Sequence, residues 1–221
     1  MFKFENVIKS YVLLLLLLGI DGFSVSNIKD TKHNLAYSKG GGIGSIENDE
    51  LCVYCHTPSG TMSGSDSQPL WNKAISSKSF LIYSVTNVES SDKPVTANSS
   101  LACLSCHDGI TAINVLANVS GYKRSNTTDT DLPALDSGVA RLKIGEDKNH
   151  PVSVVYTSGV AGLKAISSAL VGWAGVTNID GLLRNNRVEC GSCHDPHEAT
   201  NGTFLRISNG KGDLCTGCHV K

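Results

Sequence analysis

Four short cysteine and histidine motifs carry most of the chemistry in this sequence. They read "CVYCH", "CLSCH", "CGSCH" and "CTGCH", and together they use all eight cysteines. Two thiols spaced in this way can add to the two vinyl groups of one porphyrin, and the adjoining histidine can bind the iron as its proximal ligand. We therefore predict four covalently bound haems of the c type, attached through Cys52, Cys55, Cys103, Cys106, Cys190, Cys193, Cys215 and Cys218, with proximal ligands His56, His107, His194 and His219.

Zinc sites and disulfide bonds are the alternative uses of these cysteine pairs. A zinc site with four cysteines also uses Cys-x-x-Cys pairs, but it gives no reason for a histidine directly after every pair. Disulfide bonds would not require that histidine either. Four complete matches to the haem pattern therefore favour haem attachment.

The three remaining histidines, His33, His150 and His197, are predicted to be distal iron ligands. A surface or capping role is the alternative for each of them. Pro151 biases His150 toward an extended backbone, which is a stiff presentation for a ligand. His197 lies only three residues after His194, so the two cannot easily reach opposite faces of one porphyrin. We expect His197 to bind a neighbouring haem, which would bring two haems close together.

Residues 1–26 have the pattern of a signal peptide. Lys3 and Lys9 precede an apolar run at 11–20, and small residues at 24–26 suit signal peptidase. An uncleaved membrane anchor is the alternative, but the run is shorter than the ~20 residues that span a bilayer. We predict cleavage after Ser26, so that residues 27–221 form an exported tetrahaem domain without stable membrane insertion.

Composition indicates a mostly irregular, loop-rich fold with short helices. The chain contains 22 glycines and has a formal net charge of -1, and few stretches show sustained periodicity. Haem propionates would make the loaded protein acidic, which disfavours nucleic acid and anionic membranes as partners. We expect the haems to form most of the core. One amphipathic helix is expected within residues 159–176, where apolar residues recur at helical intervals: Val160, Leu163, Ile166, Leu170 and Trp173.

Several longer segments resemble a known family. "TKHNL", "CVYCHTP", "PLWNK", "CLSCHDG", "NHPVS", "CGSCHDPH" and "DLCTGCH" look like the OmcE-type tetrahaem cytochromes, which polymerise into extracellular nanowires. The similarity runs from about residue 31 to 220. It implies a multihaem cytochrome fold around a stacked chain of four haems, with iron bound by two histidines. It also implies an extracellular filament of identical subunits, in which one distal histidine binds a haem of the next subunit.

The first motif departs from the family at one position. The family's first site usually reads "CHTPH", whereas this chain has Ser59 in the histidine position. Seven histidines cannot fill eight axial positions, so one haem is five-coordinate, takes a ligand from elsewhere, or uses sulfur. We predict that Met62, the only methionine besides Met1, supplies that sulfur. Packing as a gap-filler is the alternative, and Pro58 and Gly60 disfavour a regular helical turn there.

Head-to-tail assembly is expected to involve His33. It lies six residues after Asn27, the predicted start of the mature chain, and terminal arms are poorly ordered unless something ties them down. A bond from such an arm to iron in the next subunit is a heterologous contact, which repeats into a ring or a filament. We therefore expect His33, rather than His150 or His197, to be the ligand that crosses.

Electron transfer is the predicted function, without enzymatic activity and without catalytic residues, because iron bound by two histidines has no open position. Other redox proteins or extracellular electron acceptors would be the partners. Two alternatives remain open. A membrane-anchored tetrahaem quinol dehydrogenase would need residues 5–22 as a spanning helix. A multihaem reductase with one open haem would need an acid or base beside that iron.

Overall fold

The computed structural model describes the parts of the chain that hold every cysteine and every histidine. These parts are residues 28–35, 51–57, 71–73, 98–108, 116–117, 150–160 and 162–220. The predicted signal peptide at 1–26 and the predicted ligand Met62 lie outside the described residues.

Short elements separated by loops make up the described residues, as the sequence predicted. α2 (Asn98–His107) is the longest helix, with ten residues. One small antiparallel sheet pairs β1 (Val154–Val155) with β2 (Arg187–Val188). The other elements are η1 (Ile28–Asp30), η3 (Leu51–Tyr54), α3 (Ile179–Leu182), α4 (Cys190–Cys193) and α5 (Asp213–Cys218).

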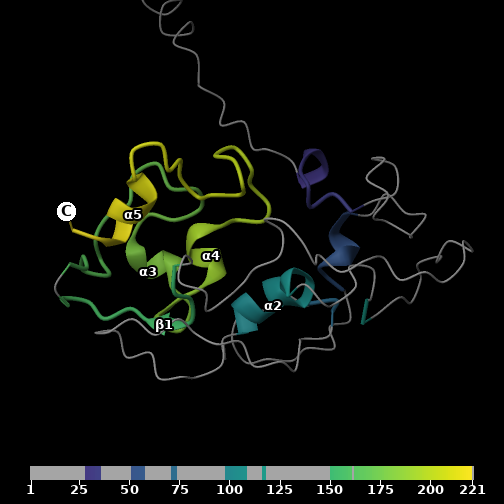
Figure 1. The fold of residues 1–221 in the computed structure, drawn as a ribbon, viewed down its shortest axis with the longest axis horizontal. Helices are drawn as coiled ribbons and strands as arrows, with labels where there is room; N and C mark the ends of the chain where they lie inside the picture. Colours follow the sequence, from purple (N-terminus) through teal and green to yellow (C-terminus); the bar gives the residue numbers. More distant parts are fainter. Residues whose placement is uncertain are drawn as a thin grey trace, which may run out of the picture.

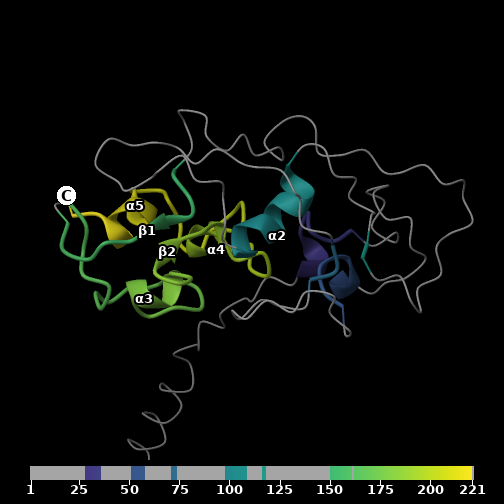
Figure 2. The ribbon, with the colours of Figure 1, turned by 90° about the horizontal axis from the view of Figure 1, so that it is seen from below.

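The four cysteine and histidine motifs follow one another along the longest axis of the molecule. Figure 1 shows α5, α4 and α2 in that order from left to right, followed by the blue segment that contains η3. The perpendicular view of Figure 2 shows the same order. Each of these elements carries one motif, so the motifs form a row in the order of the chain.

The prediction of a helix within residues 159–176 is wrong. The described part of this segment consists of turns and isolated bridges, such as the one between Leu163 and His219. Leu170 and Trp173 are nevertheless buried. The spacing of the apolar residues therefore indicated which side chains are buried, but it did not indicate a helix. Glycines in the left-handed region interrupt any helix here, with φ of 81° at Gly159, 88° at Gly162, 77° at Gly172 and 73° at Gly175.

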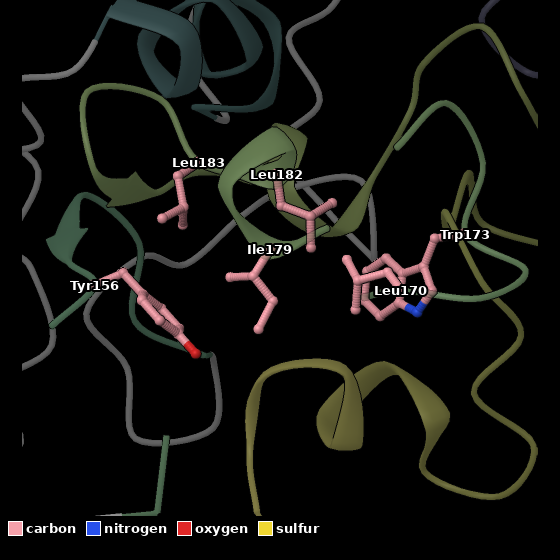
Figure 3. Close-up of a cluster of buried hydrophobic side chains, with 6 residues drawn as sticks. All are labelled: Tyr156, Leu170, Trp173, Ile179, Leu182 and Leu183. Atoms are coloured by element: carbon pink, nitrogen blue, oxygen red, sulfur yellow. The ribbon is translucent and has the colours of Figure 1, made fainter. Parts of the chain in front are cut away.

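An apolar core lies between this segment and the short helices α3 and α5. Asn178 caps α3, because its side-chain oxygen accepts the backbone N–H of Gly181 at 3.0 Å. Leu214 and Cys218 of α5 pack against this core, which connects the fourth motif to it. Figure 3 shows the buried members of this cluster: Tyr156, Leu170, Trp173, Ile179, Leu182 and Leu183.

Gly217, inside the fourth motif, lies directly against the indole of Trp173. A Cβ added at position 217 would be 2.3 Å from Cζ2 of Trp173. We expect Gly217→Ala to lower the free energy of unfolding by about 1–3 kcal/mol, because the buried indole must move. Gly191→Ala is the matched control, since Gly191 also lies between the cysteines of a motif and a Cβ there meets nothing within 4 Å. Urea denaturation of both variants measures the difference, and an equal loss in the two would contradict the expectation.

Candidate functional site

Each motif folds as a turn of helix, which brings its three reactive side chains to one face. Positions i, i+3 and i+4 lie on the same side of a helical turn, and these are the positions of the two cysteines and the histidine. The second motif lies within α2. In the other three, the histidine N–H donates to the carbonyl oxygen of the first cysteine, at 2.7 Å from His56 to Cys52, 3.0 Å from His194 to Cys190 and 2.9 Å from His219 to Cys215.

Six of the seven histidines lie in facing pairs, and each pair joins a motif histidine to one of the other three. Two imidazoles bound on opposite sides of one metal, with metal–nitrogen bonds of about 2 Å, have ring centroids roughly 6 Å apart. Each pair therefore has the ring separation that an iron bound between two imidazoles would require, and the donor set fits haem. The centroid separations are 6.1 Å for His33 and His107, 6.2 Å for His56 and His197, and 6.3 Å for His150 and His219.

His33 faces a histidine of its own chain. Besides its contact with His107, its ring stacks on Phe204, with centroids 4.2 Å apart and an interplanar angle of 12°. Burial lowers the pKa of His33, and His107 lowers it further, which favours the neutral imidazole that binds iron. The ligation of the next subunit's haem by His33, expected from the sequence, stays a prediction. No pattern in the sequence indicated that Phe204 contacts a candidate ligand.

His197 faces the first motif, which is the arrangement that ligation of a neighbouring haem requires. Its ring and that of His56 are nearly parallel, at 14°. Trp71 packs edge-on against His56, and its indole N–H donates to Oγ of Ser105 in α2 at 3.1 Å. Next to it, the side chain of Asn72 donates to the carbonyl oxygen of Val53 at 2.7 Å. The "WN" pair of the sequence thus connects the first motif to the second.

Lys73 is buried beside thiols of the first two motifs. Burial raises the pKa of Cys55 to about 11, and the charge of Lys73 acts in the opposite direction. Burial also raises the pKa of Cys106, which Lys73 counteracts by its charge and by a hydrogen bond. Sequence reasoning did not assign this role to Lys73. Its charge favours the reactive thiolate at both attachment sites.

His150 and His219 form the pair at the other end of the row. Nδ1 of His150 lies 2.9 Å from the carbonyl oxygen of Pro151. A carbonyl can only accept, so Nδ1 carries the proton and Nε2 keeps the lone pair that a metal needs. The hydroxyl of Tyr156 lies 3.2 Å from the carbonyl oxygen of Cys218, which holds the fourth motif against the core.

His194 is the histidine that remains. Its Nδ1 lies 2.9 Å from the carbonyl oxygen of Thr203, which again leaves Nε2 available for iron. The structure describes all seven histidines, and the other six are paired, so no histidine is left over for the sixth position at this motif. With a haem at each motif, the third motif would be the one whose iron lacks a second histidine. Met62, predicted to supply it, lies outside the described residues.

The second and third motifs meet where α2 contacts α4. The thiols of Cys103 and Cys190 lie close enough to affect each other's pKa, which lowers that of Cys190 to about 7 and raises that of Cys103. The buried carboxylate of Glu189 accepts hydrogen bonds from Ser100 and, at 3.0 Å, from Ser153. Attachment cysteines of two different motifs therefore lie near each other where α2 packs against α4.

All eight cysteine thiols are free of disulfide bonds. Within the described ranges, no group of three or more histidine, cysteine, aspartate or glutamate side chains is placed to hold a bare metal ion. In that same part of the chain, no helix has the length and apolar character needed to cross a membrane. Every thiol thus remains available for a thioether bond.

Comparison with protein families gives one match over the last two motifs. A family model described as "Doubled CXXCH motif" matches residues 184–221. A search of curated proteins gives no match. With the loop-rich fold, the matched motif indicates a multihaem cytochrome of the c type, which binds haem covalently and transfers electrons.

Proposed function

We propose that this chain is a tetrahaem cytochrome that carries electrons along a row of four haems. The single observation that carries the proposal is the set of three histidine pairs with centroids 6.1–6.3 Å apart, each containing one motif histidine. Iron held between two histidines has no open position for a substrate, so it is suited to electron transfer. The order of the motifs along the molecule supports a linear path (Figures 1 and 2).

Different residues of the chain would have different roles in binding the haems. Bound haem iron supplies one-electron chemistry by alternating between the ferric and ferrous states. The four cysteine pairs would hold the haems covalently, and the motif histidines would each supply one ligand to an iron. His33, His150 and His197 would supply a second ligand to three of the irons. The packing of α2 against α4 supports neighbouring second and third attachment sites.

The wider setting follows from the resemblance to the OmcE-type cytochromes. We propose export after cleavage of residues 1–26 and assembly of identical subunits, head to tail, into an extracellular filament. Redox proteins would deliver electrons to it, and extracellular acceptors would receive them. Because His33 faces His107 of its own chain, the junction between subunits would depend on other contacts.

A reductase is the second candidate, and His194 is the observation that favours it. An iron at the third motif without a histidine in the sixth position could bind a small substrate. Such an enzyme also needs an acid or base beside the iron. Electron transfer is preferred because six histidines are already placed in pairs that would saturate three irons.

Intact-mass measurement of the exported protein tests the proposal. We expect a polypeptide that begins near Asn27 and carries four haems, because each of the four motifs is complete. Replacing Cys215 and Cys218 by Ala should remove one haem and leave three. A mass equal to the bare polypeptide, or stoichiometric zinc, would exclude the proposal. Electron microscopy of the secreted fraction tests the filament separately.

A further inference from the structure

The carboxylate of Asp195 joins the distal-ligand candidate His197 to a buried arginine. Oδ1 of Asp195 lies 3.2 Å from Nδ1 of His197 and accepts the backbone N–H of the same residue at 3.1 Å. Oδ2 lies 3.2 Å from Nη1 of Arg206. One carboxylate thus holds both the backbone and the ring of His197.

Arg206 fixes this carboxylate from the other side. Its side chain is only 10% exposed. Nε donates to the carbonyl oxygen of Gly191 at 2.8 Å, and Nη1 also donates to that of Ala174 at 2.9 Å. Its backbone N–H donates to the carbonyl oxygen of Cys193 at 2.9 Å. A guanidinium anchored at so many points keeps Asp195 oriented toward His197.

The ionised carboxylate is an acceptor only, so it favours the His197 tautomer that carries its proton on Nδ1. Nε2 then has a lone pair available for the metal, and the ring already faces His56 at 6.2 Å. Carboxylate partners of ligating histidines fix the ring and make the ligand more basic. A more basic ligand stabilises the ferric state.

We propose that Asp195 is a positioning residue, which orients His197 and lowers the reduction potential of the haem at the first motif. The inference rests on the proposed haem function. The pair at the other end of the row provides a contrast, because the ring of His150 has the neutral carbonyl of Pro151 as its partner. The chain thus gives two distal ligands partners of different charge, and Asp195 is the charged one.

Asp195→Asn tests this proposal, because asparagine keeps the shape and can still accept a hydrogen bond but removes the charge. Spectroelectrochemical titration should show one of the four haems with a higher potential. The ratio of ferric to ferrous iron at that haem should fall at fixed potential, because the ligand loses its charged partner. Asp180→Asn is the matched control, since it removes the same charge from an exposed residue of α3.

Magnetic resonance spectra of the iron-binding histidines separate a specific effect on His197 from a loss of folding. In ferrous protein labelled with ¹⁵N-histidine, one distal ring N–H of the wild type should be far downfield and slow to exchange, and it should move in Asp195→Asn alone. Equal potentials in the two variants, an equal shift of all four haems, or the absence of such an N–H in the wild type would overturn the role of Asp195. Intact mass reports separately on the haem count, so a failure of the haem proposal is recognised as such.

Discussion

His33→Ala is expected to leave four attached haems but to convert the haem at the second motif from low-spin to high-spin. His33 faces His107 with ring centroids 6.1 Å apart, and no other histidine is available to replace it. The opened iron should bind added cyanide, which the wild-type haem at this motif should resist. Electron paramagnetic resonance and optical titration of monomeric protein measure both effects.

Monomeric protein distinguishes ligation by His33 within its own chain from ligation across subunits. If His33 binds iron within its own chain, the wild-type monomer keeps a low-spin haem at the second motif, and filaments still form after the substitution. If His33 crosses to the next subunit, as its position near the predicted start of the mature chain suggested, the wild-type monomer already has an open haem there and His33→Ala abolishes filaments. Lys32→Ala, at the adjacent exposed residue, is the control.

Met62→Ala is expected to change the haem at the third motif more than any other. We predict that Met62 sulfur completes the axial position for which His194 has no histidine partner, and thioether ligation raises the potential of a haem. Oxidised wild-type protein should show the near-infrared band of sulfur bound to iron, and one haem should titrate well above the other three. Met62→Ala should abolish both features, and Ser59→His should restore a low potential.

Variants that lack one pair of attachment cysteines identify the haem that Met62 binds. Replacing Cys190 and Cys193 by Ala should remove the near-infrared band together with one haem, whereas the same change at Cys215 and Cys218 should remove a haem and keep the band. A wild-type protein with one high-spin haem that binds cyanide readily would show that the position is vacant, and the reductase would then be the better proposal.

Local spacing made the chemistry of the motifs predictable, because the reactive groups of each haem site lie within five consecutive residues. The partners of these motifs depend on distant contacts. His33 and His107 are far apart in the sequence, and nothing near either residue indicates the other. The arm expected at His33 was inferred from its position near a terminus, and that position gives no indication of the contact between its ring and Phe204.

Two further differences have local causes. The spacing of Leu163, Leu170 and Trp173 suits a helix, but glycines with positive φ turn the backbone. Leu170 and Trp173 are therefore buried in loops, and Leu163 is partly buried there. Asp195 lies in "CGSCHDPH", and an aspartate two residues before His197 is a known turn signal that could have been used. The role of Arg206 could not be predicted, because its hydrogen bonds join segments separated by many residues.

Under the proposed function, the row of motifs along the molecule (Figure 1) would act as a series circuit. In a series circuit the slowest step limits the current, and there is no parallel branch around a defect. Damage at either interior position, α2 or α4, would separate the two ends, whereas damage at η3 or α5 would only shorten the path. The interior junction, where α2 packs against α4, is also where Glu189 is buried. The two motifs at which an interruption would be most harmful are thus carried by helices that pack against each other.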